Sequence, residues 1–471
     1  MLMSLQLIYG PSGSGKSYTL YKKIIEQSIR EPDREFIVIV PEQFTMQTQR
    51  ELVELHPNRG ILNIDVQSFL RLAWRIFEEV GVDTHTVLED TGKNLLLRRV
   101  ASRQKNDLTV LGRNFRKPGY ISQVKSIISE LKQYDVSLEE LDEQLCSGKK
   151  DALSYKLQDI RNLYEGFQEE LQGKYITSEE ILEELCYVVK KSEILKGCVV
   201  ALDGFTGFTP IQNKLLRELM QTAEKIYVTV TLDAWEDPMK KVSMHKLSYL
   251  SKKTIQQLAG AAKECGCMLE KPEVLGKEGS IRFRSAPALR FLERHLFRPG
   301  NQIYEAQDSQ KLERELSLHV ARDAKAEAEF AARTIWHLVR EENLRYRDIA
   351  VITGDMESFG DHMKKELQQK GIPCFIDRTR KLLLNPLVEF LRAALQIAAK
   401  SFRYESMFRY LRTGLAGLKK DEIDRMENYV LANGINSRRR WEEPWDEQEE
   451  PFKEKILPPL LAFVDQVREK D

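Results

Sequence analysis

The sequence has few of the features that mark membrane, disulfide-rich or strongly charged proteins. Among its 471 residues, 72 Lys+Arg balance 72 Asp+Glu, so no overall positive charge points to nucleic acid. No apolar run approaches the roughly 18 residues that a membrane-spanning helix needs, and we expect no membrane partner. The mean hydropathy of −0.43 indicates a soluble globular chain, and the length suggests roughly three domains.

Cysteine is scarce and scattered. Of the six, only Cys265 and Cys267 lie close together, and no second pair completes four metal ligands. The seven histidines show no metal-ligand spacing either. Scattered thiols are typical of reduced cytosolic proteins, so we expect a cytoplasmic protein without a zinc or iron–sulfur site in this span. The first residues run directly into a glycine-rich motif, and we expect neither a signal nor a transit peptide there.

Short apolar runs alternate with helical patterns in the first part of the chain. Helical patterns at 18–27 and 46–55 follow the first two runs. This alternation predicts an α/β fold with a doubly wound parallel sheet. The predicted strands lie at 5–9, 36–40, 61–66, 198–205 and 225–232.

Two further regions depart from this pattern. Residues 88–192 hold leucine-spaced, charged helical segments, which predict a helical insertion within the sheet domain. After a polar linker at 301–311, a second α/β unit begins near residue 312 and ends in helices. Its predicted strands are 316–320, 349–353 and 372–377, and its predicted helices are 326–342 and 357–370.

The strongest motif is a glycine-rich loop that fits G-x-x-x-x-G-K-[ST]. Glycines let backbone N–H groups turn inward around phosphates, while Lys16 reaches the β- and γ-phosphates and the Ser17 hydroxyl binds Mg²⁺. The loop follows an apolar run and precedes a helical pattern, which favours a nucleotide site over a chance glycine turn. The predicted ATP-binding residues are Gly10, Pro11, Ser12, Gly13, Ser14, Gly15, Lys16 and Ser17.

A phosphate loop needs an acid at the end of another strand to hold Mg²⁺ through water. Asp203 follows four apolar residues and is the predicted partner of Ser17 at the metal. The alternative is an ordinary aspartate that caps a turn. The next residue is Gly204, where many such ATPases have a glutamate that orients the attacking water.

Several segments resemble the AddB family, whose members pair with AddA in bacterial helicase–nucleases acting on double-strand breaks. The resemblance implies an N-terminal RecA-like domain over 1–87 and 193–300, the helical insertion over 88–192, and part of a second RecA-like domain over 312–471. It also implies ATP and Mg²⁺ as ligands, and single-stranded DNA, duplex ends and an AddA-like subunit as partners. The matching segments are LIYGPSGSGKS, VIVPEQFTMQTQREL, VQSFLRLAWRIF, ALDGFTGFTPIQ, LERHLF and IAVITGDMESF.

Departures from the related superfamily-one helicases bear on activity. No adenine-reading glutamine segment precedes the loop, Gly204 stands where a glutamate is expected, and Gly354 stands near the position of a γ-phosphate arginine. Loss of such an arginine alone costs on the order of 10³–10⁵ in rate, so we expect ATP binding with weak turnover. Family members are more than twice this length and end in a nuclease domain with an iron–sulfur cluster, so we expect an N-terminal piece without either.

In this fold the segments that follow the strands face DNA at the carboxyl edge of the sheet. They offer short polar groups, aromatic rings and a guanidinium, a mixture that single-stranded DNA binders use. The alternative for the aromatic members is packing into the core. In AddB proteins this region resembles the part that recognises the recombination hotspot sequence. The predicted DNA-binding residues are Gln43, Thr45, Phe69, Arg71, Trp74, Phe205 and Phe208.

Two classes of function compete. The first is an ATP-binding, DNA-scanning subunit of a helicase–exonuclease that processes broken DNA ends for recombinational repair and senses a hotspot. The second is a stand-alone P-loop ATPase or an active superfamily-one helicase. A kinase would need an arginine-rich lid segment, which the sequence does not offer.

Overall fold

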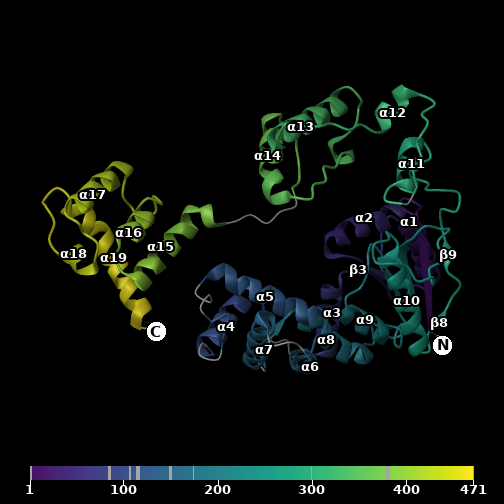
Figure 1. Ribbon diagram of the computed structural model, residues 1–471, viewed down its shortest axis with the longest axis horizontal. Coiled ribbons are helices and arrows are strands. Elements are labelled where there is room, and N and C mark those ends of the chain that lie inside the picture. Colours follow the sequence, from purple (N-terminus) through teal and green to yellow (C-terminus); the bar gives the residue numbers. More distant parts are fainter. Residues whose placement is uncertain are drawn as a thin grey trace. The chain divides into compact units, whose positions relative to one another are not determined.

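The computed structural model describes residues 3–82, 86–104, 108–112, 117–147, 151–172, 174–298, 300–376 and 382–469. Two compact units make up the chain, Met1–Ser317 and Leu318–Asp471. The first unit holds a central sheet with helices on both faces, and the second is helical (Figure 1).

The sheet of the first unit is parallel throughout. Its strands follow the order β3-β2-β6-β7-β1-β8, and β9 also pairs with β1. Each of the five apolar runs in this unit contains a strand, so the predicted α/β fold with a parallel sheet is confirmed. The strands are β1 (Ser4–Gly10), β2 (Phe36–Ile39), β3 (Ile64–Gln67), β6 (Val199–Leu202), β7 (Lys225–Thr231), β8 (Met268–Leu269) and β9 (Glu273–Val274).

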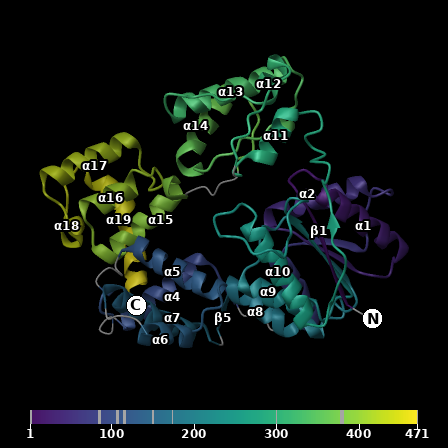
Figure 2. The ribbon, with the colours of Figure 1, turned by 45° about the vertical axis from the view of Figure 1, so that its right-hand side comes forward.

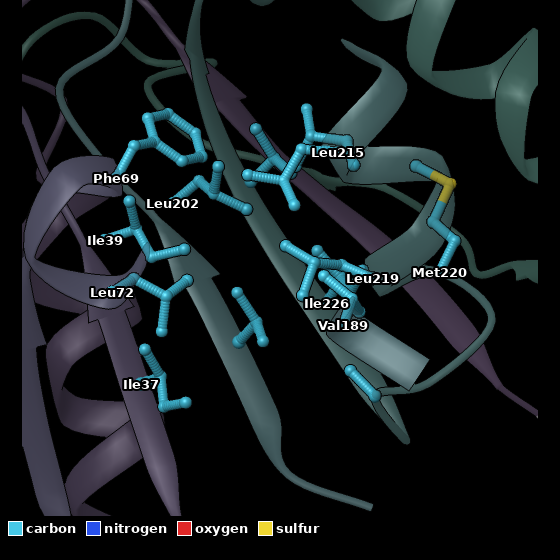
Figure 3. Packing of buried hydrophobic residues seen from close by; sticks show 14 of the residues in the cluster. Ile37, Ile39, Phe69, Leu72, Val189, Leu202, Leu215, Leu219, Met220 and Ile226 are labelled. Atoms are coloured by element: carbon cyan, nitrogen blue, oxygen red, sulfur yellow. The ribbon is translucent and has the colours of Figure 1, made fainter. Parts of the chain in front are cut away.

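The strands are apolar on both faces because helices cover both sides. On one face, α1 (Lys16–Arg30) and α2 (Thr45–Leu55) pack against alternate strand residues such as Val38. On the other face, residues such as Ile39 meet four further helices. Figure 3 shows this second layer, with Phe69 and Leu72 lying beside Ile39 and Leu202. Its helices are α3 (Phe69–Val80), α8 (Ser178–Val188), α9 (Pro210–Leu219) and α10 (Tyr249–Glu264).

The chain between β3 and β6 adds a helical cluster with its own apolar core (Figure 2). Asp159 is fully buried there and accepts hydrogen bonds from the backbone N–H groups of three consecutive residues, 109–111. The helices are α4 (Asp90–Arg103), α5 (Pro118–Gln133), α6 (Leu138–Ser147) and α7 (Ala152–Leu171).

A short parallel pair that sequence patterns did not indicate accompanies this cluster. The pair consists of β4 (Thr86–Leu88) and β5 (Tyr175–Thr177). Helix α8 follows β5, and a capping box at Thr177 and Glu180 begins it. The buried side chains of α8 contribute to the core of the main sheet rather than to that of the helical cluster.

The first unit ends with two short helices, α11 (Pro287–His295) and α12 (Ser309–Glu315). Asp308 caps α12 by accepting hydrogen bonds from the N–H groups of Gln310 and Lys311. The predicted polar linker at 301–311 therefore turns helical in its last three residues.

The second unit begins with α13 (Ala324–Arg340), the turn η3 (Tyr346–Asp348) and α14 (Met356–Gln369), where helices were predicted at 326–342 and 357–370. The predicted strands at 316–320, 349–353 and 372–377 were wrong for the residues that the structure describes; Asp377 lies outside them. The apolar pattern suits a strand, but a strand also requires a neighbouring backbone to bond with. Instead, Val320 and Ile352 are each 94% exposed.

The remaining helices form a bundle around Trp441, which is fully buried. It comprises η4 (Leu382–Leu384), α15 (Pro386–Lys400), α16 (Tyr404–Leu411), α17 (Lys420–Ala432), α18 (Arg438–Glu442) and α19 (Glu450–Glu469). Across the described part of the chain, the helices are too short or too polar to span a bilayer.

Candidate nucleotide site and carboxyl edge of the sheet

The glycine-rich loop joins the end of β1 to the start of α1. Gly13 and Gly15 have φ angles of +74° and +90°, a left-handed conformation that glycine adopts without a steric cost. Gly15 is also the N-cap of α1, and it provides no side-chain cap. The N–H groups of the first turn are therefore directed into the loop without a side-chain acceptor, as in anion-binding helix starts.

Lys16 lies at the first position of α1 and turns back over the loop. Its Nζ donates to the carbonyl oxygens of Gly10 and Pro11, at 3.2 and 3.0 Å, and it forms no ion pair with the described residues. Burial lowers the pKa of Lys16, and the positive charge of Arg282 lowers it further, while Asp203 acts in the opposite direction. A buried cation that contacts only carbonyl dipoles favours the arrival of an anion.

Ser14 adds a second group that lacks a partner. Its Oγ is buried and has no hydrogen-bond partner among the described residues. The loop is tightly built around it, because a Cβ at Gly10 would lie 2.6 Å from this oxygen. Together with Lys16, this hydroxyl fits a loop that holds phosphate.

Asp203 directly follows β6, and β7 lies between β6 and β1 in the sheet. The side chain is 5% exposed. Each carboxylate oxygen accepts one hydroxyl: Oδ2 from Tyr21 at 2.7 Å and Oδ1 from Thr229 at 2.5 Å. The carboxylate is therefore held in one orientation and remains close enough to Lys16 to influence its charge.

Gly204 has a φ angle of +79°, which any residue with a Cβ adopts at a cost. A glutamate at this position would be strained even though a Cβ would have ordinary contacts, the nearest being Pro41 Cδ at 3.5 Å. The backbone therefore disfavours a water-orienting glutamate here. Gly354 belongs to the second unit, in the turn before α14.

A segment from far along the chain, residues 275–282, packs against the loop, and sequence reasoning did not find it. Ser280 Oγ donates to the carbonyl oxygen of Ser12 at 2.8 Å, and the Arg282 N–H donates to that of Gly13 at 3.2 Å. A Cβ at Gly13 would lie 2.6 Å from Ser280 Oγ. No local pattern signals this contact, because it depends on β9 pairing with β1.

Glu293 of α11 is a further charged group that sequence reasoning missed. Burial raises the pKa of Glu293, and the nearby Asp233 raises it further. Asp233 itself is paired with Arg298 at 2.6 Å. Within the described residues, no group of three His, Cys, Asp or Glu side chains is arranged to hold a metal ion. Mg²⁺ at this site would need ligands from phosphate and water in addition to the protein.

The predicted polar DNA contacts lie just after β2 and β3. Gln43 is exposed in the turn η1 (Glu42–Phe44), whereas Thr45 is buried and its hydroxyl donates to the carbonyl oxygen of Glu42. Arg71 is exposed on α3 and pairs with the Glu42 carboxylate at 3.2 Å. The two segments are therefore in direct contact at this edge of the sheet.

Three of the predicted aromatic residues form a continuous row. The ring of Phe69 lies 5.4 Å from that of Phe205, which lies 5.2 Å from Phe208. Phe69 is only 6% exposed and belongs to the main core, while the other two rings are half-buried against it. Ser68 caps α3 through the Arg71 N–H, so α3 begins at this row.

Trp74 lies further along α3 and is 38% exposed. Its ring meets Phe77 edge-on at 5.9 Å, and it lines a cavity of about 950 Å³ that extends toward α7 and α8. The same cavity is lined by five glutamates, at positions 165, 169, 180, 183 and 184. Because these carboxylates repel phosphate, a nucleic-acid strand would have to meet Trp74 from outside the cavity.

Comparison with known proteins places these features in a family context. The family model described as "ADDB, N-terminal" matches residues 7–293, and the one described as "UvrD-like helicase C-terminal domain" matches residues 284–455.

The chain is also similar to curated proteins that are named as the AddB-type subunit of an ATP-dependent helicase/deoxyribonuclease. It is 46% identical to that of Lachnoclostridium phytofermentans over 450 residues, covering 94% of this chain and 38% of the relative. The identity to the Clostridium novyi protein is 35% over 476 residues, covering 99% and 41%. The chain thus spans about two fifths of the length of these relatives.

Proposed function

The chain belongs to the AddB family, and on that premise we propose that it is the ATP-binding, DNA-scanning part of an ATP-dependent helicase–deoxyribonuclease. In this proposal it works with an AddA-like subunit, processes double-strand DNA ends for recombinational repair, and senses a hotspot sequence on single-stranded DNA. The observation that carries the proposal is a phosphate loop in the same sheet as a polar and aromatic carboxyl edge.

The loop would hold the phosphates of ATP through the N–H groups of α1 and the Nζ of Lys16. Both groups lack an anionic partner among the described residues, which supports this role. Mg²⁺ would bind the hydroxyl of Ser17 and, through water, the carboxylate of Asp203. When bound, the metal would neutralise phosphate charge.

We further propose that this site binds ATP without efficient hydrolysis. Support comes from the left-handed backbone at Gly204, which disfavours a glutamate, and from the glycine at position 354. The alternative is a stand-alone P-loop ATPase or an active helicase, in which other residues take both roles.

Gln43, Thr45, Phe69, Arg71, Trp74, Phe205 and Phe208 are the residues that we propose contact DNA. Their positions after β2, β3 and β6, which are neighbours in the sheet, support a shared surface. For the domains, we propose a RecA-like domain over 1–87 and 193–300, a helical insertion over 88–192, and part of a second RecA-like domain over 312–471.

Nucleotide-dependent thermal stability tests the assignment of the loop. A ligand at 100 times its Kd stabilises the native state by about 2.7 kcal/mol, and a unit of this size gains about 2–4 °C per kcal/mol. Wild type should therefore melt several degrees higher with ATP–Mg²⁺, and Lys16→Ala should lose that shift. Lys22→Ala is the matched control, since this lysine is exposed on the same helix. An undiminished shift in Lys16→Ala would reject the site.

ATP turnover separates the proposal from its alternative. We expect phosphate release well below 1 s⁻¹, the low end of ordinary enzymes being about 1 s⁻¹, with or without single-stranded DNA. Faster release would favour the active ATPase or helicase.

A further inference from the structure

A chain of buried hydroxyls leads away from Asp203 toward α2. Tyr21 Oη lies 2.7 Å from Asp203 Oδ2 and 3.3 Å from Thr48 Oγ1. Tyr21 is 3% exposed, Thr48 4% and Asp203 5%, so water does not compete for these bonds. The three side chains come from α1, α2 and the end of β6.

The number of protons sets the direction of this chain. A phenol has one O–H group, and because ionised Asp203 can only accept, Tyr21 donates to it. Tyr21 must therefore accept from Thr48, whose hydroxyl supplies the second proton. Burial raises the pKa of Tyr21, and Asp203 raises it further, so the phenol keeps its proton at neutral pH. Both hydrogen bonds then point toward Asp203 and polarise each other.

The two ends of the chain lie at different proposed ligands. Asp203 is the acid proposed to reach Mg²⁺ through water. Thr48 is one turn from Thr45 on the buried face of α2, directly after the turn that carries Gln43. A bond that holds Thr48 therefore also holds the start of α2, where two of the proposed DNA contacts lie.

We propose that the Tyr21 hydroxyl couples nucleotide binding at Asp203 to the position of α2, and thereby to DNA affinity at Gln43 and Thr45. This inference rests on the proposed function. A hydrated Mg²⁺ beside Asp203 draws on the carboxylate that accepts from Tyr21, which changes the strength of the bonds along the chain. Coupling of this kind is reciprocal, so DNA must alter ATP affinity by the same factor.

Thr229 provides a matched control. It donates to the other oxygen of Asp203 at 2.5 Å and is also buried, but it lies on β7 and is not part of the hydroxyl chain to α2. Tyr21→Phe and Thr229→Val each remove one hydrogen bond to Asp203, and only the first breaks the chain. Thr48→Val breaks the chain at its far end and leaves both bonds to Asp203 in place.

The test measures binding of a fluorescein-labelled single-stranded oligonucleotide to the full chain by anisotropy, with and without saturating ATPγS–Mg²⁺. We expect the wild-type affinity to change by about fivefold or more, the lower end of allosteric coupling. Tyr21→Phe and Thr48→Val should reduce the factor to about one, while Thr229→Val should keep it. Hydrogen exchange at residues 42–55 should respond to nucleotide only where the factor is kept. A melting curve with ATPγS for each variant verifies folding and nucleotide binding.

The outcomes separate the inference from the proposed function. If wild type binds both ligands with a factor of one, the coupling is refuted and the function stands. If Thr229→Val loses the factor together with Tyr21→Phe, the hydroxyl only orients Asp203, and the inference fails. If wild type binds no nucleotide, the proposed function and the inference fall together.

Discussion

Replacing Trp74 by alanine should weaken DNA binding much more than it weakens the fold, whereas replacing Phe69 should do the opposite. The two residues lie on the same helix and were both predicted to contact DNA. Phe69 is 6% exposed within the main core, and Trp74 is 38% exposed at the rim of a cavity. Exposure decides which ring has a face that a base can stack on.

The burial of each ring sets the expected loss of stability. A fully buried Phe or Trp costs about 3–5 kcal/mol when truncated to alanine, and Phe69→Ala should fall in that range. Trp74 keeps more than a third of its surface in water, so Trp74→Ala should cost roughly 2–3 kcal/mol. Stacking of one base is worth about 1–3 kcal/mol, which corresponds to about a 5- to 150-fold loss of DNA affinity.

Urea unfolding and oligonucleotide anisotropy on the same preparations measure both quantities. Trp74→Phe is a useful intermediate, because it keeps a stacking face and part of the packing against Phe77. The reasoning would be refuted if Trp74→Ala bound single-stranded DNA within twofold of wild type while unfolding as easily as Phe69→Ala. That result would make Trp74 a packing residue of the cavity wall.

Arg71→Ala should lower the slope of log K against log salt by about 0.7 if the guanidinium neutralises one phosphate of a single strand; an unchanged slope across a salt titration would remove Arg71 from the phosphate contacts. Gly204→Glu should lower the free energy of unfolding by roughly 1–2 kcal/mol because of its left-handed backbone, and phosphate release should stay low. A gain in turnover would show that the missing glutamate was the limiting group. Burial raises the pKa of Cys198 to about 12, so iodoacetamide at pH 8 should label the exposed Cys146 and Cys374 first in a mass-spectrometric time course.

The first unit could be predicted well because its signals are local. Each run of apolar residues in a parallel sheet is buried on both faces, so β1, β2 and β6 read as continuous apolar stretches. The family assignment, carried by segments such as VPEQFT and SFLRLAW, is confirmed as well. The strands predicted in the second unit failed because hydrophobicity alone does not supply a backbone partner, as the exposed Ile352 shows.

The candidate site was only half visible in the sequence. Lys16 and Asp203 are marked by a motif and by a strand end, but Tyr21, Thr229 and Ser280 carry no motif. Their roles arise from distances across the sheet: 182 positions separate Tyr21 from Asp203, and 268 separate Ser280 from Ser12. The exposure of Trp74 and the burial of Phe69 also depended on packing, which a helical pattern alone leaves open.

The position of β1 in the sheet has a consequence for synthesis on the ribosome. Its neighbours are β7, β8 and β9, and all of them begin at or beyond residue 225. At about 5–20 residues per second, the nascent chain therefore carries an unpaired β1 for on the order of ten to forty seconds. Strands β2 and β3 can pair with each other during that time, but the glycine-rich loop gains its framework only after most of the first unit has emerged. The N-terminal strand is thus translated first and docked late, and slow non-local pairing of this kind favours chaperone binding to the nascent chain.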